Sequence, residues 1–216
     1  MLFRSGNHRF FLQHQLYSCA GDPRTSDHQF YTTARLAHDR GADGLSLFNF
    51  VYYRKGLGED IPVMEPPFHV LPRLSDTAFL SRQHQYYMLG NTSYYGQMPR
   101  RIEAGQPAEF TLEMVKRPGD ETVPADGRLR VHTVERCSAE LFSRLSFNGR
   151  DLEPTDDASR FFGNPFDRMI SPPGHRRAWI LGGDVPIERE NRLRVTTREP
   201  CQIIYIDCGI EQRQEL

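Results

Sequence analysis

From Ile102 onward the sequence consists of short runs in which apolar and polar residues alternate, and turn-forming residues separate the runs. Alternation with a period of two places the apolar side chains on one face of a strand. Asn148-Gly149 is a strong signal for a tight hairpin turn. The expected strands cover residues 108–115, 128–134, 141–148, 177–181, 192–197 and 202–210. Several short strands at this spacing predict an antiparallel, jelly-roll-like β-sandwich over residues 102–216.

Residues 1–101 follow a different pattern, in which expected strands and helices alternate. A short strand at 10–17 precedes a helix at 28–40, which Ser26 or Asp27 caps and Gly41 ends. The mostly apolar run at 44–51 suits a strand that is covered on both faces, as in a parallel sheet. Strand, helix and strand with short connections predict a βαβ unit.

The segment between residues 53 and 101 completes this first part. Residues 53–73 are rich in Pro and Gly and predict a long loop. A second helix is expected to begin after Ser75 or Asp76 as its cap and to run to about Met88, with Gly90 at its end. The residues at helical spacing are Phe79, Leu80, Gln83 and Tyr87. Residues 92–101 are interpreted as a linker, so the expected domain boundary lies between residues 101 and 102.

Residues 30–50 contain the pattern RGADG-x-x-x-FNF after a helix with regularly spaced alanines. This segment resembles the last helix-to-strand step of bacterial, family-10-like glycoside-hydrolase TIM barrels. The motifs LSFNGRDL at 145–152 and NRLRV at 191–195 are similar to the β-sandwich that follows the barrel in the same proteins. The resemblance implies an α/β part followed by an all-β part. Residues 1–101 would be the C-terminal remnant of a truncated (β/α)8 (TIM) barrel, with its last one or two βα units.

The resemblance also implies a function, namely a fragment of a glycoside hydrolase that acts on polysaccharide. Hydrolysis of a glycosidic bond usually needs two carboxylates, but the expected strand at 10–17 contains neither Asp nor Glu. The catalytic acids are therefore unidentified and expected upstream, in a missing N-terminal barrel of the same chain. We expect this fragment to form one wall of the barrel cleft and to be inactive alone. The alternative is a non-catalytic sandwich module that binds carbohydrate or serves as a structural support.

Five residues form the predicted carbohydrate-binding set. Asn49 would be delivered by the strand at 44–51 to the C-terminal rim of the barrel, where active sites of this fold lie. Tyr52 and Tyr53 offer aromatic faces for sugar rings, or alternatively pack the rim. Arg54 is included as a partner for a substrate acid, although an ion pair with Glu59 or Asp60 is the favoured interpretation. His14, at the tip of the expected strand at 10–17, completes the set.

Composition and charge exclude several classes of partner. The formal net charge is -1, and the basic residues are scattered, so neither nucleic acid nor an anionic membrane surface is expected. No apolar run approaches the roughly 20 residues of a membrane-spanning helix. The sequence suggests no cofactor and no metal site. Localisation stays open, with a secreted or periplasmic parent protein as one alternative. Residues 1–5 are interpreted as a sequencing-adaptor scar, with the natural protein extending upstream.

Several single residues are assigned structural roles. The cysteines at 19, 137, 201 and 208 lack a CxxC spacing and are interpreted as buried free thiols. Cys201 and Cys208 are seven apart, which in a regular strand places them on opposite faces. Trp179 is expected in the core rather than as a sugar-stacking platform. Asn148 and Asn191 are interpreted as turn residues that tolerate a positive φ.

Overall fold

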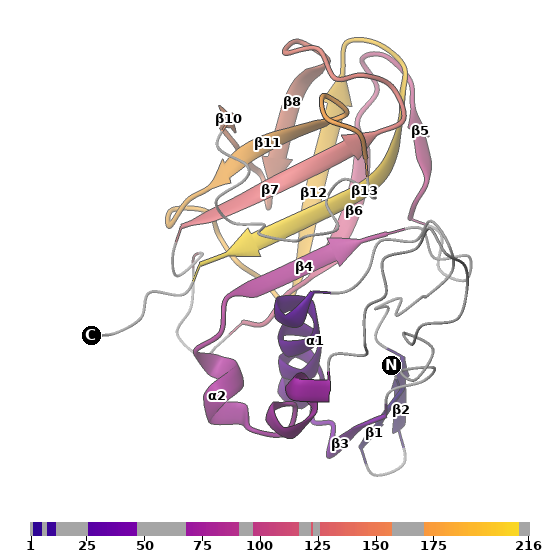
Figure 1. Ribbon diagram of the computed structural model, residues 1–216. Helices are drawn as coiled ribbons and strands as arrows, with labels where there is room; N and C mark the ends of the chain where they lie inside the picture. Colours follow the sequence, from indigo (N-terminus) through magenta and orange to yellow (C-terminus); the bar gives the residue numbers. More distant parts are fainter. Residues whose placement is uncertain are drawn as a thin grey trace, which may run out of the picture. The chain divides into compact units, whose positions relative to one another are not determined.

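The computed structural model describes residues 2–5, 8–11, 26–46, 68–90, 97–116, 122, 126–156 and 171–211 of the 216-residue chain. The chain divides into two compact units, Met1–Gln83 and His84–Leu216, here called the N-terminal and the C-terminal unit (Figure 1). Each unit is described by itself. Among the described residues, no helix combines the length and the apolar character that crossing a membrane requires.

Helix α1 (Asp27–Asp39) is the longest helix described in the N-terminal unit. Ser26 caps it through a capping box, in which the Ser26 N–H donates to Gln29 Oε1 at 2.6 Å and the Gln29 N–H donates to Ser26 Oγ at 3.4 Å. Gly41 follows the helix with a φ of 80°, a conformation that glycine adopts at little cost. The prediction of a helix at 28–40 with these two end signals is confirmed.

Helix α1 packs against two short helical segments between residues 68 and 81. These are the 3-10 helix η2 (Phe68–Arg73) and the short helix α2 (Thr77–Ser81). Asp76 caps α2, because its Oδ1 accepts the Phe79 N–H at 2.8 Å. The buried side chains of this cluster are Phe30, Tyr31, Ala34, Val70, Leu74 and Leu80.

A small sheet of three strands completes the N-terminal unit. Its members are β1 (Leu2–Ser5), β2 (His8–Phe11) and β3 (Gly44–Ser46), in the order β2-β1-β3. Both outer strands pair antiparallel to β1. The strands expected at 10–17 and 44–51 overlap with β2 and β3 in part, and residues 12–17 and 47–51 lie outside the described residues. The described pairings therefore do not include the parallel pair of a βαβ unit, and the barrel remnant stays a prediction.

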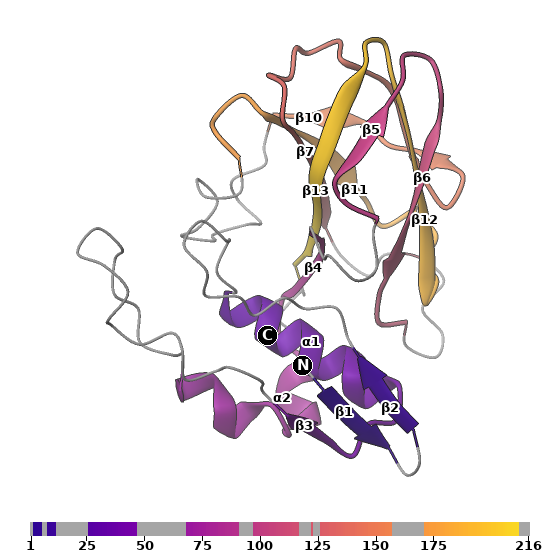
Figure 2. The same cartoon turned by 90° about the vertical axis from the view of Figure 1, so that its right-hand side faces the viewer.

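The C-terminal unit consists of two antiparallel sheets, consistent with a β-sandwich (Figure 2). The first sheet contains, in order, β10 (Pro154–Thr155), β11 (Arg176–Leu181), β7 (Gly127–Thr133), β13 (Cys201–Ile210) and β4 (Gln85–Leu89), with β5 (Arg100–Ile102) also paired to β13. The second contains β6 (Ala108–Glu113), β12 (Glu190–Thr197), β8 (Phe142–Phe147) and β9 (Arg150–Asp151). All six strands expected from the sequence are present, with shifted ends.

Two segments of the C-terminal unit differ from the sequence prediction. The helix expected to reach Met88 ends at Ser81, and Gln85–Leu89 is instead strand β4, paired antiparallel with β13. The expected linker at 92–101 contains the start of β5, which also pairs with β13. Strand β4 therefore belongs to the same sheet as the strands that follow Ile102, although it precedes the expected domain boundary.

A β-bulge in β13 changes which residues share a sheet face. The pairing of β13 with β7 shifts between Ile203 and Tyr205. Ile203 pairs with Thr133, and Cys208 pairs with Leu129, two positions of β7 that lie on the same face. Cys201 and Cys208 are consequently on one face, not on opposite faces as expected. Both are buried free thiols, as predicted; Cys137 is a half-buried free thiol, and Cys19 lies outside the described residues.

Candidate functional site

The predicted carbohydrate-binding residues His14, Asn49, Tyr52, Tyr53 and Arg54 all lie outside the described residues. Their assignment to the barrel rim stays a prediction. The polar sites described below lie in the C-terminal unit, and sequence reasoning singled out only part of them.

The first site is a buried charge cluster on one face of the larger sheet, formed by Tyr86, Arg130, His132, Ser171 and Asp207. The Arg130 guanidinium donates two hydrogen bonds to the Asp207 carboxylate, from Nε to Oδ1 at 2.9 Å and from Nη2 to Oδ2 at 2.5 Å. The Tyr86 hydroxyl donates to Asp207 Oδ2 at 2.6 Å. The side chains of Arg130, His132 and Asp207 are all 0% exposed. The cluster is thus a fully desolvated ion pair with satisfied carboxylate oxygens.

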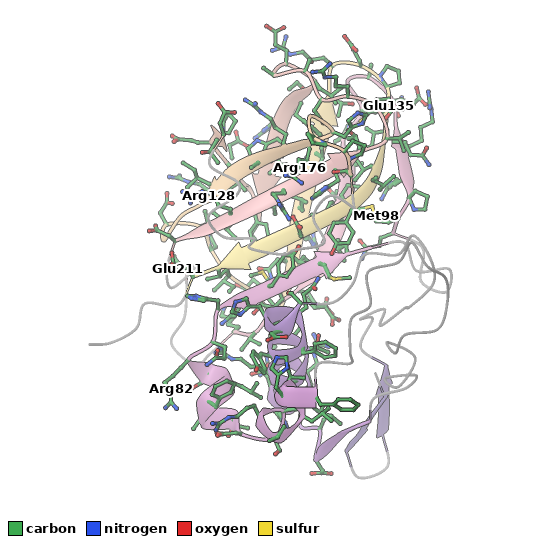
Figure 3. All side chains as sticks on the ribbon, viewed as in Figure 1. Arg82, Met98, Arg128, Glu135, Arg176 and Glu211 are labelled. Atoms are coloured by element: carbon green, nitrogen blue, oxygen red, sulfur yellow. The ribbon has the colours of Figure 1, made fainter. Side chains whose placement is uncertain are left out.

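Strand register explains why these side chains meet. Arg130 of β7 lies directly opposite Asp207 of β13, and His132 lies opposite Tyr205. Residues directly opposite in an antiparallel pair point to the same face. The same register places Arg128 of β7 and Arg176 of β11 on this face, and both are labelled in Figure 3. The sequence signal was the alternation in Arg128–Thr133, where every second residue is charged or imidazole.

His132 links the ion pair to a serine. Its Nδ1 lies 2.8 Å from Ser171 Oγ, and its Nε2 lies 3.4 Å from Asp207 Oδ1. The Tyr205 ring packs edge-on against the imidazole, with ring centroids 5.4 Å apart. Serine, histidine and aspartate are the residue types of a catalytic triad. Here, however, Ser171 is 1% exposed, and the Asp207 oxygens already accept bonds from Arg130 and Tyr86. The arrangement fits a structural network better than a nucleophile.

The buried charge cluster lowers the pKa of Asp207 and raises the pKa of Tyr86. Burial raises the pKa of Asp207, but the charges of Arg130 and His132 outweigh burial and hold this pKa well below its ordinary range. Burial and the neighbouring Asp207 charge raise the pKa of Tyr86. The carboxylate is therefore ionised and the phenol neutral at physiological pH, so the Tyr86 hydroxyl donates a hydrogen bond to the carboxylate.

The second site is an asparagine bridge, formed by Asn148 and Asn191. Asn148 has a φ of 48° and starts the Asn-Gly turn between β8 and β9, so its prediction as a turn residue is confirmed. Its Nδ2 donates to Asn191 Oδ1 at 2.8 Å and to the Pro186 carbonyl at 2.9 Å. Its Oδ1 accepts the Arg192 N–H at 2.8 Å. The hairpin turn is thereby tied to the beginning of β12.

Asn191 does not have the positive φ expected for it but lies in β12, with its side chain buried. Its Nδ2 donates to the Leu112 carbonyl at 3.1 Å and to the Glu188 carbonyl at 2.7 Å. Its Oδ1 also accepts the Glu188 N–H at 2.8 Å. The two motifs quoted for the sandwich, at 145–152 and 191–195, therefore meet through their asparagines, a contact that sequence reasoning missed.

The aromatic side chains of the C-terminal unit are mostly in its core. Trp179 is 4% exposed and packs edge-on against Phe142, with ring centroids 5.0 Å apart, as the core interpretation predicted. The other buried aromatics are Tyr86, Tyr87, Phe110, Phe147 and Tyr205. Among the described residues of this unit, the large apolar side chain that is exposed is Val134. The part of the unit that the structure describes thus has no row of exposed aromatic rings.

No described group of three or more His, Cys, Asp or Glu side chains is arranged to hold a metal ion.

Comparison with known proteins gives weak structural likenesses. No family model and no curated protein sequence matches the chain, so the resemblance to family-10-like barrels rests on the sequence motifs alone. BpGH86A, a β-porphyranase of glycoside hydrolase family 86 from the human gut bacterium Bacteroides plebeius, is 14% identical with a TM-score of 0.39, over 62% of this chain and 21% of that one. Wild-type BuGH86 in complex with neoagarooctaose is also 14% identical, with a TM-score of 0.37, over 58% of this chain and 19% of that one. This chain spans about a fifth of the length of these structures.

Proposed function

We propose that this chain is the C-terminal part of a glycoside-hydrolase-like protein that acts on polysaccharide, and that its β-sandwich is a structural accessory domain. The sequence motifs at 30–50, 145–152 and 191–195 support the class of protein. The observation that carries the role of the sandwich is the buried charge cluster, because its Arg130, His132 and Asp207 side chains are 0% exposed and this part of the sheet face is therefore not open to a ligand.

Burial of the aromatics supports a structural role over carbohydrate binding. A sheet that binds sugar through stacking needs aromatic faces that are open to solvent. In the described part of the C-terminal unit, the Tyr, Phe and Trp rings are buried or half-buried instead. The ion pair of Arg130 and Asp207 lies on the sheet face that such a ligand would occupy and is 0% exposed.

For the N-terminal part, the proposal keeps the sequence interpretation. Residues 1–83 form the last βα units of a TIM barrel and contribute one wall of its cleft, because β4 and β5, within the expected range 1–101, belong to the larger sheet of the sandwich. Asn49, Tyr52 and Tyr53 lie at the rim and contact sugar, with His14 and Arg54 nearby. The catalytic acids are supplied by the barrel strands that precede this segment, so the fragment is inactive alone.

The test uses the full-length gene product recovered from the source. We would measure reducing-sugar release on a polysaccharide panel, beside a variant in which Asn49, Tyr52 and Tyr53 are changed to Ala. Activity that falls in the variant supports a glycosidase with these residues at its rim. Activity that is unchanged keeps the enzyme class and removes the predicted site.

The alternative, a carbohydrate-binding sandwich, is tested on residues 84–216 alone. We expect no binding to the same polysaccharides in affinity electrophoresis. Retarded migration on any of them, combined with a full-length protein that hydrolyses none, would replace the structural role with a binding module.

A further inference from the structure

The side chains of Gln97 and Arg100 occupy the open edge of the smaller sheet. Strand β6 is the end member of this sheet, and its neighbour among the described strands of the sheet is β12 (Figure 2). In an antiparallel edge strand, every second residue directs its N–H and C=O away from that neighbour. Such unpaired groups form a template on which another strand can add.

On β6 these outward groups have side-chain partners. Gln97 acts as a substitute strand at Thr111: its Nε2 donates to the Thr111 carbonyl at 3.0 Å, and its Oε1 accepts the Thr111 N–H at 2.7 Å. Arg100 Nη1 donates to the Glu109 carbonyl at 2.8 Å. One primary amide therefore reproduces both bonds that a neighbouring strand would make at Thr111.

Two further features distinguish residues 97–100, the segment that covers β6. The Arg100 guanidinium lies over the Phe110 ring, with its carbon 5.3 Å from the ring centroid, and Phe110 itself is 1% exposed. Pro99, between the two covering residues, has no backbone N–H with which to extend the sheet. Gln97 and Arg100 thus bind the outward backbone groups of β6 through their side chains, and Pro99 offers no N–H to a further strand.

We infer that Gln97 and Arg100 form an edge cap, which prevents a second copy of this chain from adding to the smaller sheet through its own β6. Two copies would pair antiparallel about a two-fold axis at Thr111, since each offers the same N–H and C=O pair. In that register Glu109 of one copy faces Glu113 of the other. This like-charge contact opposes pairing and weakens as salt screens it.

The test compares the chain with a variant carrying Gln97→Ala and Arg100→Ala. The matched control carries Gln106→Ala and Arg101→Ala, which removes the same residue types from exposed positions whose side chains have no described contact with the β6 backbone. We would measure weight-average mass by light scattering against protein concentration, at low and at high salt. We expect the cap variant to shift toward dimer, more at high salt, while the control follows the wild type.

Hydrogen exchange at Thr111, measured at a concentration where the chain is monomeric, gives a second readout that does not require association. At low concentration the Thr111 amide should exchange faster in the cap variant than in the wild type or the control, and it should regain protection as the dimer forms. Gln97→Glu keeps the acceptor for the Thr111 N–H but faces the Thr111 carbonyl with a carboxylate oxygen, so we expect an intermediate shift. A folded cap variant with wild-type mass at both salt concentrations would overturn the inference, as would unchanged exchange at Thr111.

Discussion

At Asp207, a carboxylate without solvent exposure is held by Arg130 and Tyr86. A desolvated ion pair of this kind adds little net stability compared with apolar side chains of the same volume, but removal of one partner leaves a buried, uncompensated charge. Removing one partner of the ion pair should therefore cost more stability than replacing both. Unfolding of the C-terminal unit can be followed selectively, because Trp179 is the only tryptophan of the chain and lies in this unit.

Arg130→Met should destabilise the C-terminal unit by about 3–5 kcal/mol, because Asp207 stays buried without its cation. The double variant Arg130→Met with Asp207→Leu should recover much of this loss. Urea unfolding followed by Trp179 fluorescence measures both. A double variant that is less stable than Arg130→Met would show that the ion pair contributes more than the desolvation it requires.

Stability in acid should depend on Asp207. The pKa of this carboxyl is lowered in the native state relative to its ordinary value of 3.8, so its contribution is complete above the ordinary pKa and is lost as pH falls toward the native one. We expect the free energy of unfolding to fall more steeply below about pH 4 in the wild type than in Asp207→Asn. Urea midpoints from pH 5 downward provide the comparison; parallel curves would contradict it.

Asn191→Ala should destabilise the C-terminal unit by about 1–3 kcal/mol, because the buried Leu112 carbonyl and the partly buried backbone groups of Glu188 lose their partners. Gln106→Ala, at an exposed turn position, is the control and should be neutral. The measurement is the urea midpoint of Trp179 fluorescence. Equal midpoints for the two variants would mean that water replaces the asparagine at no cost.

At the scale of elements, the Asn-Gly hairpin between β8 and β9 depends on its second residue. Gly149 has a φ of 82°, where a Cβ costs about 1–2 kcal/mol. Gly149→Ala should lower the stability of the C-terminal unit by that amount. Gly182→Ala, at a turn glycine without a positive φ, is the matched control and should cost less. Thermal unfolding by circular dichroism would rank the two.

Elements with strong end signals could be predicted from the sequence. Helix α1 has a Ser26 cap and a Gly41 stop, and strands such as β6 and β12 alternate buried and exposed residues along their length. Each signal is local, so no knowledge of distant partners was needed. The positions of the strands at 108–115, 128–134 and 192–197 were predicted for this reason.

Strand β4 was missed because its signal is not local. Gln85, Tyr86 and Tyr87 are consecutive and all buried, so the strand has no alternation, and Phe79, Leu80, Gln83 and Tyr87 happen to fall at helical spacing. Short runs of this kind cannot be assigned to helix or strand by periodicity. These residues form a strand because they pair with β13, which lies more than 100 residues away in the sequence.

The same limit applies to the candidate site. The asparagines were found as motif residues, yet their mutual contact depends on the pairing of β8 with β12. The buried charge cluster depends on the pairing of Arg130 with Asp207 across β7 and β13. Sequence spacing carries neither fact. The predicted sugar-contacting residues, which include Asn49 and Tyr52, lie outside the described residues and stay predictions.

At the scale of the whole molecule, the pairing of β4 predicts where the sandwich can be cut from the chain. Residues 84–216 contain every described partner of β13, whereas residues 102–216 lack β4 and nearly all of β5 and lose the Tyr86 bond to Asp207. We expect the longer fragment to unfold cooperatively in urea and the shorter one to be markedly less stable. Equal midpoints would support the expected domain boundary between residues 101 and 102 instead.

Strand β13 occupies the middle of the larger sheet, between β7 and β4, although it is made after every other described strand. On the ribosome, β4 and β7 must therefore wait with facing edges unpaired until Cys201–Ile210 has been synthesised. The last strand to be made is therefore inserted in the middle of the larger sheet and is not added at its edge. A nascent chain that stalls before Cys201 would carry two open edges and half an ion pair, which makes it a natural target for chaperones.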